Sequence, residues 1–448
     1  MNSDDRNDEN ELKKYQNHEF RVSLPSEMID RSKYSIWSIL KQCVDKELYR
    51  FTIPIVWNEP LSMLQRLAEN MKYSNELLDK AAEMTSAIER MKYVSAFLVS
   101  STSIHNGRLS KPFNPLLGET YEFISPEKNY RICCEQVSHH PPISAYYSES
   151  TLSSKTSPKW KYYGSVLPHM KLNILNASVE AIPEGIQTVE LPENEEVYTW
   201  HNFKVNAHNL VIGKLWFEHT GKTEIINHKL KIKCVLEYKP YSWFVRHMSR
   251  CEGYILDSND NKVALLYGRW DECLFCTNNV KSPSDFHKRV EKILAMDEID
   301  YEKIRKDKNY SDLELLWKAN GQDKAYENFF NFTQFTFKLN ELHSQLRERV
   351  VLDDENKISI GPLPATDSRY RPDMRLYEKG QIDEASNEKH RLEEKQREVQ
   401  RKTESGELEH WKPLWFEKCL HHTAPKEETW IFNNTYWNRN YEKCPDIF

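Results

Sequence analysis

Two adjacent histidines, His139 and His140, are the first candidates for chemistry in this sequence. They end a strand-like run and are followed by Pro141 and Pro142, which stop a strand because proline lacks a backbone donor and restricts the residue before it. Neighbouring strand side chains point to opposite faces, which disfavours chelation of one metal ion by this pair. Where the chain leaves the strand, both rings could donate hydrogen bonds to an anion in one pocket. From composition alone, a strand end with two half-exposed histidines is the better explanation.

Two other segments carry cations at defined spacings. Lys111 and Asn114 lie three residues apart in a loop punctuated by prolines, where lysine offers a compact charge for phosphate. Lys389, Glu393 and Arg397 follow one another at steps of four on a predicted polar helix, so they share one face. Glu393 can pair with both cations and orient them. Taken alone, each segment is better explained by an exposed lysine or by a solvated, salt-bridged helix.

Other potential sites are incomplete. Cys273 and Cys276 have C-x-x-C spacing, but no second such pair follows, which favours structural thiols over zinc or redox chemistry. His421 and His422 form a second histidine pair with no visible partner set. No nucleophile, base and orienting group assemble along the chain, so the sequence predicts no catalytic residue, no metal site and no cofactor.

Composition excludes several classes of protein. The 448 residues include only 12 glycines, and the nearest two, Gly213 and Gly221, lie eight apart. The glycine-rich motifs of dinucleotide-binding, P-loop and α/β-hydrolase sites need closer glycines. A net charge of −6 does not indicate a nucleic-acid binder. Three features predict a cytoplasmic protein with reduced thiols. They are the nine cysteines, the polar and acidic N-terminus, and the lack of any apolar run near the ~20 residues that a membrane span needs.

Periodicity predicts one large mixed domain. Residues 1–20 are polar and predicted to be disordered. Helical spacing predicts helices over 32–44, 61–71 and 89–99, and a long polar helix over 383–402.

Between about residues 120 and 270 the period changes to two, which predicts an antiparallel meander that tends to close on itself. Thr220 and Gly221 are predicted to form one of its turns, and a further strand is predicted over 330–339. The predicted strands of the meander are 130–137, 162–167, 188–191, 197–205, 210–219, 222–228, 231–238, 253–256 and 263–270.

Three segments together resemble the signatures of the oxysterol-binding protein family of lipid-transfer proteins (the ORP/Osh family). They are Glu-Gln-Val-Ser-His-His-Pro-Pro at 135–142, Lys-Pro-Phe-Asn-Pro-Leu-Leu-Gly-Glu at 111–119 and Glu-Lys-His-Arg-Leu-Glu-Glu-Lys-Gln-Arg at 388–397. They occur in the family's order, and the resemblance runs from about residue 21 to residue 448. Ile-Gly-Lys-Leu-Trp at 212–216 and the ending Cys-Pro-Asp-Ile-Phe are similar to short members of the subgroup of oxysterol-binding protein-related proteins 1 and 2.

The resemblance implies an α+β fold: a large, incomplete antiparallel β-barrel that encloses a lipid tunnel, with an N-terminal lid and flanking helices. The implied ligand-binding domain covers 21–448. Within it, the lid spans about 32–48 and is followed by helices to about residue 100. The barrel covers about 110–340, and a C-terminal helical region covers about 380–448.

The resemblance also implies a function without catalysis: exchange of sterol and phosphoinositide, as alternative cargo, between membranes that the protein touches peripherally and transiently. Phosphatidylserine in place of sterol, a lipid sensor or scaffold without transfer, and an enzyme acting through the histidine pair remain alternatives. Glu327-Asn-Phe-Phe330 lacks an acidic residue after its phenylalanines, so no endoplasmic-reticulum receptor motif is predicted. The implied head-group residues are Lys111, Asn114, His139, His140, Lys389, Glu393 and Arg397, and the implied lid contacts to lipid, against plain packing, are Trp37, Leu40 and Leu48.

Overall fold

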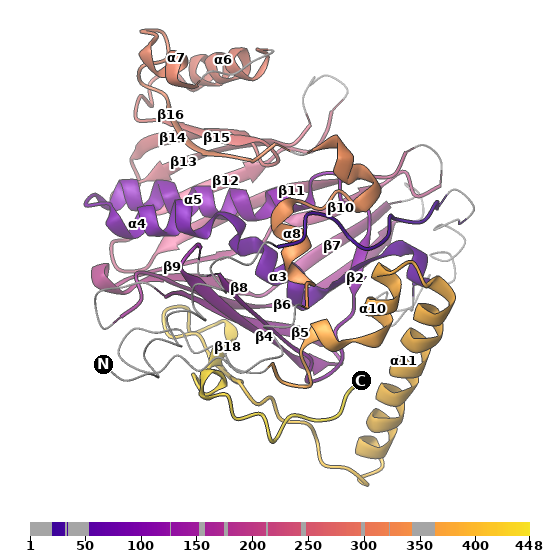
Figure 1. Ribbon diagram of the computed structural model, residues 1–448. Coiled ribbons are helices and arrows are strands. Elements are labelled where there is room, and N and C mark those ends of the chain that lie inside the picture. The colour runs from indigo at the N-terminus through magenta and orange to yellow at the C-terminus, as the bar shows by residue number, and fades with distance from the viewer. Residues whose placement is uncertain are drawn as a thin grey trace, which may run out of the picture.

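The computed structural model describes residues 20–31, 34, 53–125, 127–151, 157–173, 178–211, 214–242, 248–296, 301–321, 323–342 and 363–448 (Figure 1). Residues 1–19 and most of the predicted lid, including Trp37, Leu40 and Leu48, lie outside these ranges. The predictions made for them are therefore not addressed by the structure.

A 14-stranded antiparallel sheet dominates the molecule (Figure 1). No pairing among the described residues joins its two end strands, β3 and β16, so the barrel is incomplete, as predicted. The strands are β3 (Thr120–Ser125), β4 (Tyr130–His139), β5 (Pro142–Ser150), β6 (Lys161–Asn173), β7 (Ser178–Glu184), β8 (Ile186–Leu191), β9 (Glu196–His201), β10 (Lys204–His208), β11 (Trp216–Asn227), β12 (Lys233–Tyr238), β13 (Arg250–Leu256), β14 (Lys262–Arg269), β15 (Cys273–Thr277) and β16 (Glu314–Lys318).

Two glycines allow the sheet to bend and change partners. Gly185, with φ of 120°, separates β7 from β8, and both of these strands pair with the long strand β6. Gly221, with φ of 109°, lies inside β11, where the partner changes from β10 to β12. The predicted turn at Thr220 and Gly221 is therefore wrong, because the glycine lets one strand continue through the position. The predicted strand 197–205 is two strands, β9 and β10.

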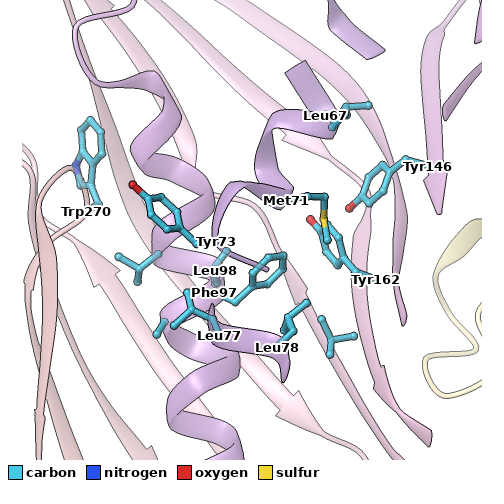
Figure 2. Packing of buried hydrophobic residues seen from close by; sticks show 14 of the residues in the cluster. Leu67, Met71, Tyr73, Leu77, Leu78, Phe97, Leu98, Tyr146, Tyr162 and Trp270 are labelled. Atoms are coloured by element: carbon cyan, nitrogen blue, oxygen red, sulfur yellow. The ribbon is translucent and has the colours of Figure 1, made fainter. Parts of the chain in front are cut away.

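Helices pack within the curve of the sheet (Figure 1). They are α3 (Met63–Glu69), α4 (Lys80–Glu83) and α5 (Ala87–Thr102), with the short turns η4 (Asn70–Tyr73), η5 (Asn75–Asp79) and η6 (Ser103–His105) beside them. Nearly all of α5 is buried, as expected for a helix surrounded by other elements. Figure 2 shows Phe97 of α5 among the aromatic and aliphatic side chains of this core, and its ring meets that of Tyr162 edge-on at 5.0 Å.

The phenylalanine-rich segment 330–339 is not a strand, which corrects the prediction. Phe330 and Asn331 take left-handed φ values of 58° and 54°. Thr333 then caps α8 (Gln334–Leu339), because its hydroxyl accepts from the backbone N–H of Thr336. The alternation of phenylalanines predicted a strand, but the cap and the core packing produce a short helix preceded by η8 (Lys324–Phe329).

The C-terminal region is helical only at its start. After η9 (Ser368–Tyr370) and α10 (Pro372–Glu378), the polar helix α11 (Ile382–Glu404) matches the predicted 383–402. Beyond it, the predicted helical region is instead a hairpin of β17 (Phe416–Leu420) and β18 (Glu428–Phe432), followed by η10 (Tyr436–Asn438). The hairpin packs on the sheet through stacked rings of Tyr147 and Phe432, 4.7 Å apart. Buried aromatic contacts, which helical periodicity does not report, hold this segment extended.

The remaining elements are a pair of short strands, two short turns and two helices. The strands β1 (Asn58–Ser62) and β2 (Lys111–Phe113) form a parallel pair, and η3 (Ile55–Trp57) precedes β1. The turn η7 (Pro192–Asn194) joins β8 to β9, and α6 (Pro283–Leu294) and α7 (Tyr301–Lys306) lie between β15 and β16 in sequence. Among the described residues, none of the helices has the length and apolar character that crossing a membrane requires.

Candidate functional site

Three distant segments meet at one pocket of about 550 Å³. Strand β2 and the loop after it supply one wall, the end of β4 supplies the second, and helix α11 supplies the third. All seven predicted head-group residues line this pocket: Lys111, Asn114, His139, His140, Lys389, Glu393 and Arg397.

Lys111 enters the pocket from β2. Asn58 on β1 positions the strand, since its amide nitrogen donates to the carbonyls of Lys111 and Pro112 at 3.1 and 3.2 Å. The Lys111 ammonium donates to Oδ1 of Asn114, the other predicted residue of this loop. Burial, and then the nearby Lys389 ammonium, lower the pKa of Lys111 to about 8. An anion between these two ammonium groups would relieve their repulsion.

The histidine rings lie together at the end of β4, with centroids 4.6 Å apart and planes at 66°. Burial, and then the neighbouring His140, lower the pKa of His139 to about 4, so the ring is neutral at pH 7. The Nδ1 atom of His139 is buried and has no hydrogen-bond partner among the described residues. A buried polar atom without a partner is costly, and a ligand in the pocket can supply the missing bond.

Helix α11 presents its predicted triplet to the pocket. The ammonium of Lys389 lies 2.8 Å from Oε1 of Glu393, and a guanidinium nitrogen of Arg397 lies 3.6 Å from Oε2. Glu393 therefore sits between the two cations, as the spacing predicted. Gln396 fixes the helix against the loop, because its Oε1 accepts from the backbone N–H of Leu117 at 3.2 Å.

Two buried residues that the sequence did not single out position the loop. Arg371 donates to the carbonyl of Asn114 at 2.8 Å and to Oε2 of Glu119 at 2.9 Å. The other oxygen of Glu119 accepts from the hydroxyls of Ser62 and Ser368, both at 2.6 Å. Glu119 lay inside a recognised segment, but Arg371 follows it by 252 residues, and no local pattern connects them.

Two apolar cavities, of about 270 and 230 Å³, adjoin the pocket and share Lys111 with it. Their apolar walls come from alternate residues of neighbouring strands, and this period-two signal is present in the sequence. Because the polar pocket and the apolar cavities meet, the arrangement suits an amphiphile with an anionic head. Apolar lining residues include Val166, Met170, Val179, Ala181, Val205, Ala207 and Phe217.

The other chemical candidates assemble into no site. Cys273 and Cys276 are buried in β15, and burial raises the pKa of each thiol, as expected of structural cysteines. His421 is buried and bonds through Nε2 to the Thr188 hydroxyl at 2.9 Å, whereas its neighbour His422 is exposed. In the part of the chain that the structure describes, no three His, Cys, Asp or Glu residues are grouped to hold a metal ion.

Comparison with known proteins now identifies the family. The family model described as oxysterol-binding protein matches residues 35–441. The chain belongs to the oxysterol-binding protein family. This confirms the resemblance predicted from the three segments and places the chain in a family of lipid-binding proteins.

Named members of the oxysterol-binding protein family are similar over nearly the whole chain. Human oxysterol-binding protein-related protein 1 is 40% identical over 444 residues, which cover 96% of this chain and 44% of that protein. Mouse oxysterol-binding protein-related protein 2 is 39% identical over 451 residues, which cover 96% of this chain and 88% of that protein. The chain thus spans less than half of the first relative and most of the second.

Solved structures of the oxysterol-binding protein family share the fold. The ORD domain of Osh1 in complex with cholesterol has a TM-score of 0.79 and 30% identity, with both chains fully covered. The Osh3 ORD from Saccharomyces cerevisiae, in complex with PI(4)P, has a TM-score of 0.73 and 26% identity, covering 96% of this chain and 99% of that one. The predicted α+β fold with a large antiparallel sheet is confirmed.

Proposed function

We propose that this protein carries one lipid at a time, either a sterol or a phosphoinositide, and exchanges the two between membranes. The observation that supports this most is the convergence of seven head-group candidates beside the apolar cavities. Similarity to domains solved with cholesterol and with PI(4)P supports both cargo classes.

The pocket would hold the phosphoinositide head by charge-assisted hydrogen bonds. Lys111, Lys389 and Arg397 supply cationic donors, and the neutral ring of His139 supplies a further donor or acceptor. The acyl chains would enter the apolar cavities, where burial contributes about 25 cal/mol per Å² of apolar surface. No covalent bond changes in this cycle, so we assign no enzymatic activity and no cofactor.

The sterol would use the apolar cavities without the head-group donors. The two cargoes would then compete for the same interior while depending on different residues. We further propose that Trp37, Leu40 and Leu48 contact the bound lipid as part of a lid, and that the protein acts in the cytoplasm through transient contact with membrane surfaces.

Lipid transfer between liposomes tests this function. We expect Lys111→Ala, Lys389→Ala and the double variant His139→Ala/His140→Ala each to reduce phosphoinositide extraction by at least tenfold while sterol transfer persists. Lys402→Ala is the matched control, since Lys402 lies on α11 but does not line the pocket. Unchanged phosphoinositide extraction in all three variants would contradict the head-group assignment.

Transfer and binding assays, together with mass spectrometry of the lipids, separate the alternatives. Phosphatidylserine transfer that exceeds sterol transfer would replace the sterol assignment. Binding without release would indicate a sensor or scaffold. A lipid product detected by mass spectrometry would indicate an enzyme.

A further inference from the structure

A second pocket, of about 650 Å³, shares no lining residue with the head-group pocket. Its walls come from η4, from η6 and the loop after it, from the turn between β14 and β15, and from the segment after β16. Ile104 lines both this pocket and the 270 Å³ apolar cavity, so one turn of chain forms a wall between them. Apart from Ile104, the proposed lipid function uses no residue that lines this second pocket.

Lys72 is the unusual residue of this pocket. It is 7% exposed. Among the described residues, it is the only buried lysine or arginine with no carboxylate within ion-pair distance. Its ammonium lies 4.9 Å from the centroid of the Tyr73 ring, and the carboxylates of Glu69 and Glu76 act on its charge from beyond ion-pair distance. The buried cations that do have carboxylate partners are Arg66, Arg90, Lys92, Arg108, Arg369 and Arg371.

A nearly buried lysine with no carboxylate in ion-pair contact is costly, and Lys72 lines a hollow large enough for a ligand. Burial lowers the pKa of Lys72 to about 8, which still leaves the group mostly charged at pH 7. The carboxylates in the pocket are already engaged: Glu272 pairs with Arg269 at 2.7 Å, and Asp271 accepts from the Ser249 hydroxyl at 2.8 Å. Glu69 is shared by Arg66 and Arg108, and Glu76 lies 4.0 Å from Lys128, so an anion from outside the chain would complete the surroundings of Lys72.

The other residues that line the pocket indicate which kind of molecule would carry the anionic group. Amide side chains of Asn106, Asn320 and Asn331 and the hydroxyl of Thr333 line the pocket, together with apolar groups such as Ile104 and Met248. Amides and hydroxyls both donate and accept hydrogen bonds, which suits a polyhydroxylated molecule and not an acyl chain. The pocket has room for more than a phosphate ion alone.

We propose that this pocket binds a phosphorylated polyol, with its phosphate beside Lys72 and its hydroxyls against the asparagine amides. The phosphate monoester can belong to a soluble molecule or to a lipid head group, since both present the same chemistry.

Calorimetry with myo-inositol 1-phosphate tests the proposal in the full chain. The double variant His139→Ala/His140→Ala serves as the background, so that binding at the head-group pocket is suppressed. In this background, we expect Lys72→Met to lower the affinity for the probe at least tenfold. Asn320→Ala, at an exposed position, should lower it at least threefold. Lys281→Met removes an exposed lysine outside the pocket and should change nothing. Unphosphorylated myo-inositol should bind at least tenfold more weakly than the probe.

Vesicles distinguish the source of the phosphate. If the ligand is a lipid head group, Lys72→Met in the same background will reduce sedimentation with phosphatidylcholine vesicles containing phosphatidylinositol 4-phosphate. If it is soluble, only the calorimetric signal will change. The Tm of ligand-free Lys72→Met should equal or exceed that of its parent, because the variant loses an unpaired buried charge. If Lys72→Met and Asn320→Ala alter neither measurement, the proposal is overturned.

Discussion

A guanidinium nitrogen of Arg371 lies 2.9 Å from Oε2 of Glu119, and both side chains are buried although 252 residues separate them. The same guanidinium donates to the carbonyl of Asn114. This pair therefore joins the loop that carries Lys111 and Asn114 to the segment before α10, and it determines where one wall of the head-group pocket lies.

Arg371→Met tests the role of this pair. Removal of the cation leaves Glu119 buried without its counter-charge, which costs about 3–5 kcal/mol of unfolding free energy. Urea unfolding measures the loss. Arg391→Met is the control, since the Arg391 side chain is 48% exposed in its pair with Glu388 and such pairs contribute about 0–1 kcal/mol. Equal effects of the two substitutions would show that Arg371 does not position the loop.

Gly185→Ala should destabilise the sheet where β7 and β8 meet. An alanine Cβ there would lie 2.1 Å from the backbone oxygen of Ser165, and φ is 120°. Gly221→Ala has a similar φ of 109° but nothing within 4 Å of its Cβ. Strain at such φ values costs about 1–3 kcal/mol, and overpacking adds about 1–3 kcal/mol. Thermal unfolding should therefore show a larger loss for Gly185→Ala than for Gly221→Ala; the reverse order would contradict the steric account of the bend.

The affinity for phosphoinositide should fall as pH rises through about 8. Burial lowers the pKa of Lys111 in the free protein to about 8, whereas a bound phosphate stabilises the charged ammonium and raises that pKa. Below pH 8 the ammonium is already charged and the affinity changes little. Above pH 8 binding requires uptake of a proton, so the affinity declines.

Titration of the dissociation constant between pH 7.5 and about 9.5 measures this effect. Lys111→Met should bind more weakly and show a flatter profile, whereas Lys402→Ala should keep the wild-type profile. A Lys111→Met profile as steep as that of the wild type would assign the titration to another group.

The thiols should react in an order set by burial. Eight cysteines are described and free; Cys419 and Cys444 are partly exposed, and the other six are buried. Burial raises the pKa of Cys133 and Cys134 well above the ordinary value, which withholds the reactive thiolate. Mass spectrometry after brief alkylation of the native protein should therefore find Cys419 and Cys444 labelled before these six. Early labelling of Cys273 or Cys276 would indicate that the C-x-x-C pair is reactive.

Local patterns predicted the parts of the molecule that depend on neighbours in the chain. The spacing of Lys389, Glu393 and Arg397 sets a shared helix face, because an α-helix repeats every 3.6 residues. Period-two alternation predicted most of the strands, because successive side chains of a strand point to opposite faces of the sheet. The same method was wrong at Gly221, where a glycine allows a strand to continue, and at Thr333, whose cap begins a helix.

The sequence by itself determined the family, the predominance of antiparallel strands and the residue types that can hold an anion, since donor chemistry and spacing are local properties. Only the tertiary structure decided that Lys111, His139 and Lys389 line one pocket and that Arg371 positions it through Glu119. It also decided that Lys72 is buried with no carboxylate of the described residues in ion-pair contact. These relationships depend on which distant segments pack together, and that packing reflects burial over the whole chain and not any single stretch of it.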